Sequence, residues 1–529
     1  MDEINQTISK KYLLATVFLI YVLSFTFIVM SHIYDPPSSG QDETVNYLFS
    51  TIYAENGNLL YLNDLNTFGE DIIRPNGVIL VNEKFVSMKF IGFPLYCGSY
   101  AMIIGTNFIP YFTLIFSIMG IFFIYVLGNQ LYGKTNGIMS CFLFLILPYH
   151  LYWSFRPLLE NIFGSVIFVL GVAYFLKYIQ EKNMKYLMLA ALFLGTSFNI
   201  RPDVVLYFIP LGFILILNLK KIGIRAIMTF MLIGLITTTP ILLLNYDLYG
   251  GYLSTGQSII HSKSPDVVGD STSVLFDKAL VNLTNLSSVS PLFALLIIAG
   301  IFIAFNKRLN SKLSRVYIFF IISSFIVFTL YYLTGTYPWQ GGGLMESYTR
   351  YVLPIYLTSV PLLSKGIQNF RHVVSKDNQS NIFGNKFVVL LVTIFITVNL
   401  LVVFSTLSND WDRRDKFEQI TITVSENTEP NAVIFISYFD VYVFPKRNVA
   451  IINKIQSANK EKAVVDIMVN LSKQNIPLYF YLQNWYSDGK SSISFNFNEF
   501  ANELHASRFE LVLIEKNSVG KLYAIRIHE

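Results

Sequence analysis

The sequence predicts a polytopic α-helical membrane protein with about eleven transmembrane helices, followed by a C-terminal soluble α/β domain. Of its 529 residues, 53% are hydrophobic and only 14% are charged, whereas soluble domains carry about 25% charged residues. Apolar runs near the length of roughly 20 residues that crosses a bilayer recur along residues 1–404. Beyond residue 404 the composition changes, and no run is apolar enough to cross.

The predicted spans alternate with loops whose basic residues set the orientation. The loops predicted inside all carry Lys or Arg, so the positive-inside rule places the N-terminus in the cytoplasm and the C-terminal tail outside. The first run is long for a signal peptide and lacks a small-x-small cleavage site, so we expect it to be retained. The expected spans are 13–30, 109–127, 137–151, 162–176, 186–199, 204–217, 226–244, 291–305, 316–333, 351–363 and 387–404.

The chain divides into two predicted domains. A transmembrane domain covers 1–404, and within it 31–107 form a first outer loop with interfacial helices. The short apolar stretch 92–104 belongs to this loop as a re-entrant or interfacial helix, because counting it as a span would move the basic loops outside. Residues 405–529 alternate strand-like and helix-like patterns, such as NAVIFISYF and KEKAVVDIMVNLSKQ, which indicates an extracytoplasmic α/β domain with a mostly parallel sheet.

Several functional classes are disfavoured by composition. The formal net charge of +5 is small for this length and does not suggest a nucleic-acid partner. Cys97 and Cys141 lie in apolar segments, as small core residues do. The six histidines are scattered without metal-ligand spacing, so a zinc site is not indicated.

An acidic pair, Asp42 and Glu43, follows the first span on the predicted outer side. Carboxylates are costly to hold near lipid, so a functional role is one interpretation. The alternative is that both are solvated loop charges, with Asp42 capping the following helix.

Other charged residues are predicted on the same outer side. Arg and Lys near a membrane surface suit a phosphate, and carboxylates can accept a proton or bind a metal. Each has a simpler interpretation: an interfacial anchor, a side chain that snorkels to the membrane surface, or an acid at a helix start. The residues are Lys89, Arg156, Glu160, Arg201, Asp203, Glu346, Arg350 and Tyr351.

Several segments, in constant order, resemble GT-C class membrane glycosyltransferases. The stretch QDETVNYLFSTIYAENGN is similar to their first outer loop, and MKFIGFPLYCGSYAMIIG to the segment after it. The later stretches WSFRPLLEN, SFNIRPDVVLYFIPL and SYTRYVLPIYLTSVPLL likewise resemble parts of that class. The closest likeness is to the protein O-mannosyltransferase and aminoarabinose-transferase branch, over about the first 400 residues.

This resemblance implies inverting transfer of a sugar from a polyprenyl-phosphate donor to a glycan, lipid or protein acceptor on the outer face. Asp42 matches the acidic residue that the family uses as general base or to orient the acceptor, with Glu43 and Glu160 as further catalytic carboxylates. A divalent metal, Mg²⁺ or Mn²⁺, is an option for these three acids. Two departures weaken the match: Leu159-Glu160 replaces a Pro-Asp, and extra residues separate Lys89 from Pro94.

The remaining predicted site residues fall into two groups, and other functions stay open. The donor phosphate is expected on Lys89, Arg156, Arg201, Arg350 and Tyr351, and the pocket is expected to include Asp203 and Glu346. A transporter or flippase of a lipid-linked substrate is an alternative, although such proteins usually show repeats and charges at the membrane midplane. A non-catalytic membrane scaffold is another. The sequence identifies neither the sugar nor the acceptor.

Overall fold

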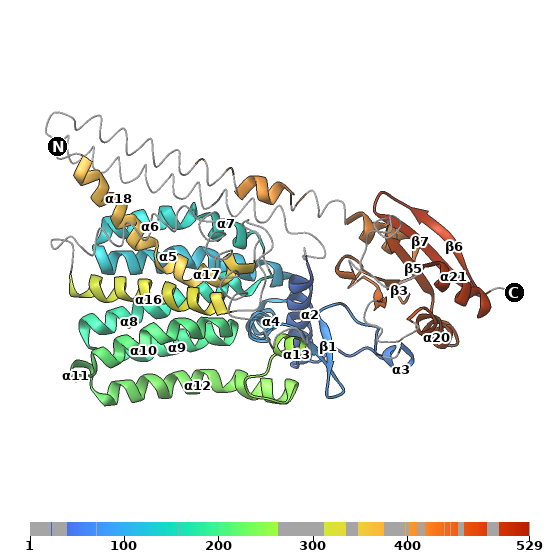
Figure 1. The fold of residues 1–529 in the computed structure, drawn as a ribbon, viewed down its shortest axis with the longest axis horizontal. Helices are drawn as coiled ribbons and strands as arrows, with labels where there is room; N and C mark the ends of the chain where they lie inside the picture. The colour runs from blue at the N-terminus through green and yellow to red at the C-terminus, as the bar shows by residue number, and fades with distance from the viewer. Residues whose placement is uncertain are drawn as a thin grey trace. The chain divides into compact units, whose positions relative to one another are not determined.

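The protein is described from a computed structural model in which its helices and strands form two compact units (Figure 1). The first comprises Met1–Ile33, Pro110–Tyr246 and Ser258–Leu407, and the second Tyr34–Ile109, Asp247–Gln257 and Ser408–Glu529. The described residues are 23, 40–69, 71–156, 158–262, 311–334, 347–374, 397, 401, 403–409, 411, 418–437, 440–444, 446–452, 460–483 and 497–527.

The first unit is helical throughout its described residues, and its long helices run roughly side by side (Figure 1). Helix α8 is the central element, because it packs against α5, α9 and α17 and most of its apolar length is buried. The helices are α5 (Phe112–Tyr132), α6 (Lys134–Leu145), α7 (Pro148–Ser154), α8 (Glu160–Glu181), α9 (Met184–Ile200), η2 (Pro202–Tyr207), α10 (Phe208–Leu217), α11 (Leu219–Ile222), α12 (Ile224–Tyr249), α16 (Lys312–Thr334), α17 (Ser347–Thr358) and α18 (Val360–Val374).

Several of these helices are long and apolar enough to cross a bilayer. Within the described residues, three qualify by length and composition: Thr106–Tyr132, Glu160–Glu181 and Ile224–Tyr249. The pair α6 and α7, bent by 56°, makes a fourth if it is one broken span. Predicted spans 13–30, 291–305 and 387–404 lie wholly or largely outside the described residues, so the count of eleven stays a prediction.

The second unit joins the first outer loop to the C-terminal part of the chain. From the outer loop it has α2 (Gln41–Asn56), α3 (Asn66–Gly69), β1 (Val78–Val81), β2 (Lys84–Ser87), α4 (Gly92–Ile104) and the start of η1 (Thr106–Tyr111). From the C-terminal part it has β3 (Val433–Ile436), η5 (Asp440–Tyr442), β4 (Asn448–Ile451), α20 (Lys460–Ser472), β5 (Leu478–Gln483), α21 (Phe497–Ala506), β6 (Phe509–Lys516) and β7 (Gly520–Ile527). The short helix α13 (Gly256–Ser262) begins at the edge of this unit.

The C-terminal strands form one mixed sheet in the order β4-β3-β5-β7-β6. Strand β3 pairs in parallel with β4 and β5, whereas β7 pairs antiparallel with β5 and β6. The sheet is therefore less parallel than the sequence suggested. The reason is the tight connection between β6 and β7, because a parallel pair needs a crossover of about a dozen residues or more.

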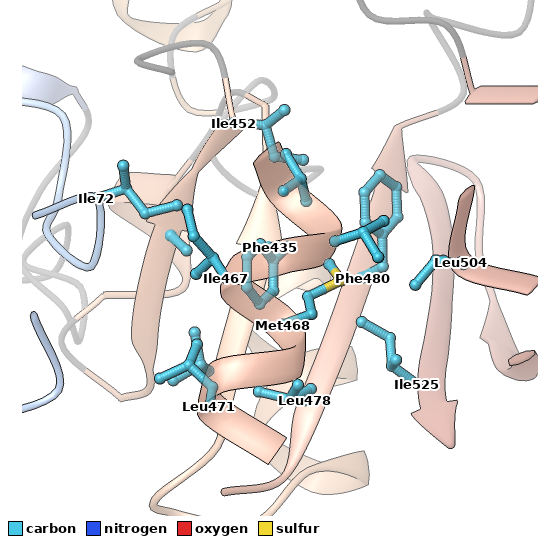
Figure 2. Packing of buried hydrophobic residues seen from close by; sticks show 14 of the residues in the cluster. Ile72, Phe435, Ile452, Ile467, Met468, Leu471, Leu478, Phe480, Leu504 and Ile525 are labelled. Carbon is cyan, nitrogen blue, oxygen red and sulfur yellow. The ribbon is translucent and has the colours of Figure 1, made fainter. Parts of the chain in front are cut away.

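The core of this sheet includes residues of the outer loop. Helix α20 covers the sheet with Ile467, Met468 and Leu471, and Ile72 approaches the same cluster from the loop before β1 (Figure 2). Its neighbour Ile73 is fully buried and forms an antiparallel bridge with Ala450 of the edge strand β4. The loop thus covers a sheet edge that would otherwise be open to pairing.

Candidate active site

Among the described residues of the first unit, the most buried charged group is that of Arg201, which follows the last residue of α9 and is 1% exposed. Its Nε donates to Oδ1 of Asp203 at 3.1 Å, and its Nη2 donates to Oδ2 at 2.8 Å. This is a two-point pair, which fixes the guanidinium in orientation as well as in place. A buried arginine needs such partners because an uncompensated charge in an apolar interior is costly.

The remaining donors of Arg201 join three helices. Its Nη1 donates to the side-chain oxygen of Asn161 at the start of α8, and to the carbonyl oxygen of Arg350 in α17 at 2.8 Å. Helix α17 contains Pro354, which has no backbone N–H to give to the carbonyl four residues earlier. Arg201 therefore supplies a hydrogen bond that the helix itself cannot make.

Tyr351 fixes the same turn of α17 from two sides. Its carbonyl oxygen accepts from the hydroxyl of the buried Tyr207 at 2.7 Å. The guanidinium of Arg201 lies 5.4 Å from the centre of the Tyr351 ring, and that of Arg350 lies 5.3 Å from it. Both distances suit cation–π attraction.

Two further predicted residues lie on the segment that leads into α8. Glu160 is the first residue of α8 and is near enough to Arg201 for their charges to interact. Arg156 is half-buried, and its guanidinium lies over the ring of Tyr152 at 5.5 Å. Glu346 lies outside the described residues.

The acidic pair lies in the second unit, in the first turn of α2. Lys89 Nζ is 2.8 Å from Asp42 Oδ1, and Glu43 is 2% exposed. Carboxylates here are favoured by the partial positive charge of the helix N-terminus. The helix begins at Gln41 with Gly40 as its N-cap residue, so Asp42 is not a capping residue as one interpretation had it.

The hairpin β1–β2 brings Lys89 to this helix. Asn82 and Glu83 form its turn with positive φ angles of 47° and 64°, as a two-residue type I′ turn requires. At its base, Arg74 lies over the ring of Phe85 at 5.3 Å, and burial lowers the pKa of its guanidinium. Its Nη1 also donates to the Val78 carbonyl of β1 at 3.1 Å, so Arg74 contacts both strands of the hairpin.

The structure therefore gathers predicted residues into two groups. Arg201, Asp203, Glu160, Arg350 and Tyr351 lie together in the first unit, and we call them the arginine cluster. Asp42 and Lys89 form an ion pair in the second unit.

Asn161 and Tyr207, which hydrogen-bond to residues of the arginine cluster, were not predicted as site residues. Neither residue type is unusual in a helix, and their importance depends on partners 40 and 144 positions away along the chain.

The described residues do not assemble an evident metal centre. No group of three or more His, Cys, Asp or Glu side chains is close enough to hold a metal ion within the described part of the chain. The predicted use of Asp42, Glu43 and Glu160 as metal ligands stays a prediction.

Comparison with known proteins identifies the fold. Residues 101–243 match the family model described as Dolichyl-phosphate-mannose-protein mannosyltransferase. No curated protein sequence matches the chain significantly.

Two solved structures share the fold at low sequence identity. ArnT from Cupriavidus metallidurans, bound to undecaprenyl phosphate, superposes with a TM-score of 0.57 at 9% identity and covers 96% of this chain and 97% of its own. The archaeal oligosaccharyltransferase AglB from Archaeoglobus fulgidus, in complex with an inhibitory peptide and a dolichol-phosphate, gives 0.53 at 12%, over 90% and 70%. The predicted resemblance to GT-C membrane glycosyltransferases is thus confirmed, together with a helical membrane fold.

Proposed function

We propose that this protein is an integral membrane glycosyltransferase that moves a sugar from a polyprenyl-phosphate donor to an acceptor on the outer face of the membrane. The proposed location is a cell membrane, with the N-terminus cytoplasmic and the C-terminal region extracytoplasmic. The acceptor is a glycan, lipid or protein, and no nucleic acid takes part.

The observation that carries this proposal is the arginine cluster. A buried arginine at a helix end in an apolar chain needs a reason, and binding of a lipid-linked phosphate nearby is a strong one. Both structural relatives named above were solved with a polyprenyl or dolichol phosphate. The family match over residues 101–243 includes α8, Arg201 and Asp203.

Within the arginine cluster, we propose that one residue holds the structure together and that others contact the donor phosphate. Arg201 has its hydrogen bonds directed to Asp203, Asn161 and the Arg350 carbonyl, so its main role is to hold the cluster together. Arg350, Tyr351 and Arg156 are the proposed phosphate contacts. Cations at this position stabilise the negative charge that develops on the leaving phosphate.

The proposed chemistry is a single inverting displacement. The acceptor oxygen forms a bond to the anomeric carbon while the bond from that carbon to the phosphate oxygen breaks. The bonding electron pair leaves with the polyprenyl phosphate, and Asp42 accepts the proton of the acceptor hydroxyl. One displacement needs one base and no covalent carboxylate intermediate. Lys89 pairs with the Asp42 carboxylate and orients it, Glu43 and Glu160 are the further proposed catalytic carboxylates, and a divalent metal ion stays an option.

An assay with labelled donors tests the proposal against its alternatives. Purified protein in vesicles is given polyprenyl-phosphate hexoses and pentoses with membrane acceptors, with and without a chelator. A transferase releases polyprenyl phosphate and moves the label to an acceptor. A flippase moves the intact labelled lipid across the bilayer, and a scaffold does neither. Either of the last two results would overturn the proposal, and loss of transfer with chelator would show that a metal is needed.

A further inference from the structure

A buried carboxylate far along the chain holds the outer loop beside the acidic pair. Asp440, in η5 after strand β3, is 3% exposed. Its Oδ2 accepts a hydrogen bond of 2.6 Å from the backbone N–H of Asn76, 364 positions earlier. Bonds to an ionised carboxylate are about twice as strong as neutral ones. This contact therefore links the C-terminal part of the chain directly to the outer loop.

Asn76 continues the connection to the helix that carries Asp42. Its carbonyl oxygen accepts from Nε2 of Gln41 at 2.8 Å, and Gln41 directly precedes Asp42 at the start of α2. One peptide segment thus receives a hydrogen bond from Gln41 and gives one to Asp440. Movement of the Asn76 backbone would change both contacts.

The base of the hairpin makes the second connection, to Lys89. Asn76 and Gly77 lead into β1, and Met88 and Lys89 leave β2, with the Met88 N–H bonded to the Gly77 carbonyl at 2.7 Å. A Cβ placed on Gly77 would lie 1.8 Å from Val45 Cγ2 of α2. The hairpin base therefore packs directly on α2. The hydrogen bond between Met88 and Gly77 makes the segment before β1 and the segment after β2 move together.

Asp440 itself is anchored in the C-terminal part of the chain. The Phe444 N–H donates to its carbonyl oxygen at 2.8 Å, and the Thr421 hydroxyl donates to the carbonyl of Tyr442 two residues later. Asp440 thus connects the hairpin base to the segment between β3 and β4.

From these contacts we infer that Asp440 is a positioning residue, which holds the hairpin base so that Lys89 and Asp42 meet in the geometry of the reaction. The inference rests on the proposed function, in which Asp42 is the base. The role that this gives to the C-terminal part of the chain is to hold the outer loop in place, without contact with the substrate.

The test compares variants of the full-length protein. Asp440→Ala removes the acceptor, Asp440→Asn keeps an acceptor oxygen, and Asp466→Ala, on the exposed face of α20, is the matched control. Small displacements of reacting groups can lower rates by about 100-fold. We expect kcat for Asp440→Ala to fall about 10- to 100-fold, with the donor KM nearly unchanged. For Asp440→Asn we expect kcat to stay close to the wild-type value.

A double variant and hydrogen exchange separate positioning from general stability. The double variant Gln41→Ala/Asp440→Ala should lose little more kcat than the more impaired single variant, because both substitutions break the same connection through Asn76. Amide exchange in Asp440→Ala should quicken at Asn76 and in the first turn of α2, but not in β3 or β5. Equal kcat values in Asp440→Ala and Asp466→Ala would overturn the inference. So would additive losses of kcat in the double variant. Faster amide exchange across the whole sheet, with kcat not restored in Asp440→Asn, would also overturn it.

Failure of the proposed function gives a different result. If wild type and Asp466→Ala both fail to transfer any sugar, the transferase proposal is wrong. The exchange measurement still reports whether Asp440 holds Asn76 and α2, because it needs no activity. Unchanged exchange in Asp440→Ala would refute the anchoring contact whatever the protein's activity.

Discussion

Arg201 donates a hydrogen bond of 2.8 Å to the carbonyl oxygen of Arg350, the carbonyl that Pro354 leaves without its helical donor. A proline four residues on removes the N–H and crowds this oxygen. The guanidinium makes up for that loss while it also pairs with Asp203. The proline and the arginine therefore act together to fix the backbone of α17 next to α8 and α9.

Loss of Arg201 should unfold the arginine cluster. Removing one partner of a fully buried ion pair costs about 3–5 kcal/mol, because the other charge is left uncompensated. The Asp203 side chain is 17% exposed, so water compensates part of its charge. We expect Arg201→Ala to lower the stability of the purified protein in detergent by at most about 3–5 kcal/mol, measured by thermal or denaturant unfolding. Arg201→Lys should be intermediate, since an ammonium cannot form the two-point bond to Asp203.

Arg225→Ala is the matched control for this prediction, because Arg225 is exposed at the start of α12. Its stability should stay within about 0.5 kcal/mol of wild type, as is usual for surface substitutions. Equal unfolding midpoints for Arg201→Ala and Arg225→Ala would contradict the buried role of Arg201.

Gly164 should be intolerant of any side chain because it makes room for Arg201. A Cβ added there would lie 3.0 Å from both Cγ and Cδ of Arg201. We expect Gly164→Ala to cost about 1–3 kcal/mol, as overpacking in a dense core does, and to lower the transfer rate through displacement of the guanidinium. Unfolding midpoints and initial rates measure the two effects.

Gly212 in α10 provides the comparison, since a Cβ there has no atom within 4 Å. Alanine is about 1 kcal/mol better than glycine inside a helix. Gly212→Ala should therefore be neutral or stabilising with an unchanged rate. If both alanine variants behave alike, the close packing of Gly164 on Arg201 is not important.

The sequence predicted the charged residues of the site better than the connections between them. Arg201 and Asp203 stand out as charges beside a proline in an apolar chain, and the structure pairs them. Asn161 carries no such signal, since its role depends on the folded position of Arg201. Asp440 was not predicted either, because its partner is 364 residues away and only the fold brings them together.

In the C-terminal sheet, too, a strand could be predicted from the sequence, but the contacts between strands could not. Strand β3 lies within NAVIFISYF, a segment that the apolar pattern marked as strand-like, whereas β4, also four residues long, was missed. Pairing direction depends on connection length, so the short turn after β6 makes that pair antiparallel. The burial of Ile73 under α20 could not be predicted, because a lone pair of isoleucines in a loop has no periodicity to interpret.

Asp42 should be essential for transfer but not for folding. Loss of a general base costs about 100- to 10,000-fold in rate. We expect Asp42→Asn to lose at least about 100-fold in kcat, while expression and donor binding stay near wild type. Labelled-donor transfer and binding to the purified protein measure the two properties.

Glu55→Gln is the control, because Glu55 lies on the same helix and is exposed. It should transfer sugar at the wild-type rate. Full activity in Asp42→Asn would show that another group accepts the proton, although the GT-C fold would be unaffected.

Ile73 should contribute to folding as strongly as a residue of the sheet itself. It is fully buried against the cluster under α20, and the side chain of Asn66 bonds to both its N–H and its carbonyl. Replacing a buried isoleucine by alanine costs about 2–5 kcal/mol. Ile73→Ala should thus lower the unfolding midpoint of the full-length protein and speed amide exchange in β4, which Ile73 bridges.

Leu513→Ala tests whether this effect comes from burial, because Leu513 is 50% exposed on β6 of the same sheet. We expect a loss below about 1 kcal/mol there, since most of the removed surface already faces solvent. If Ile73→Ala costs no more than Leu513→Ala and leaves exchange in β4 unchanged, the outer loop does not share the core of the sheet.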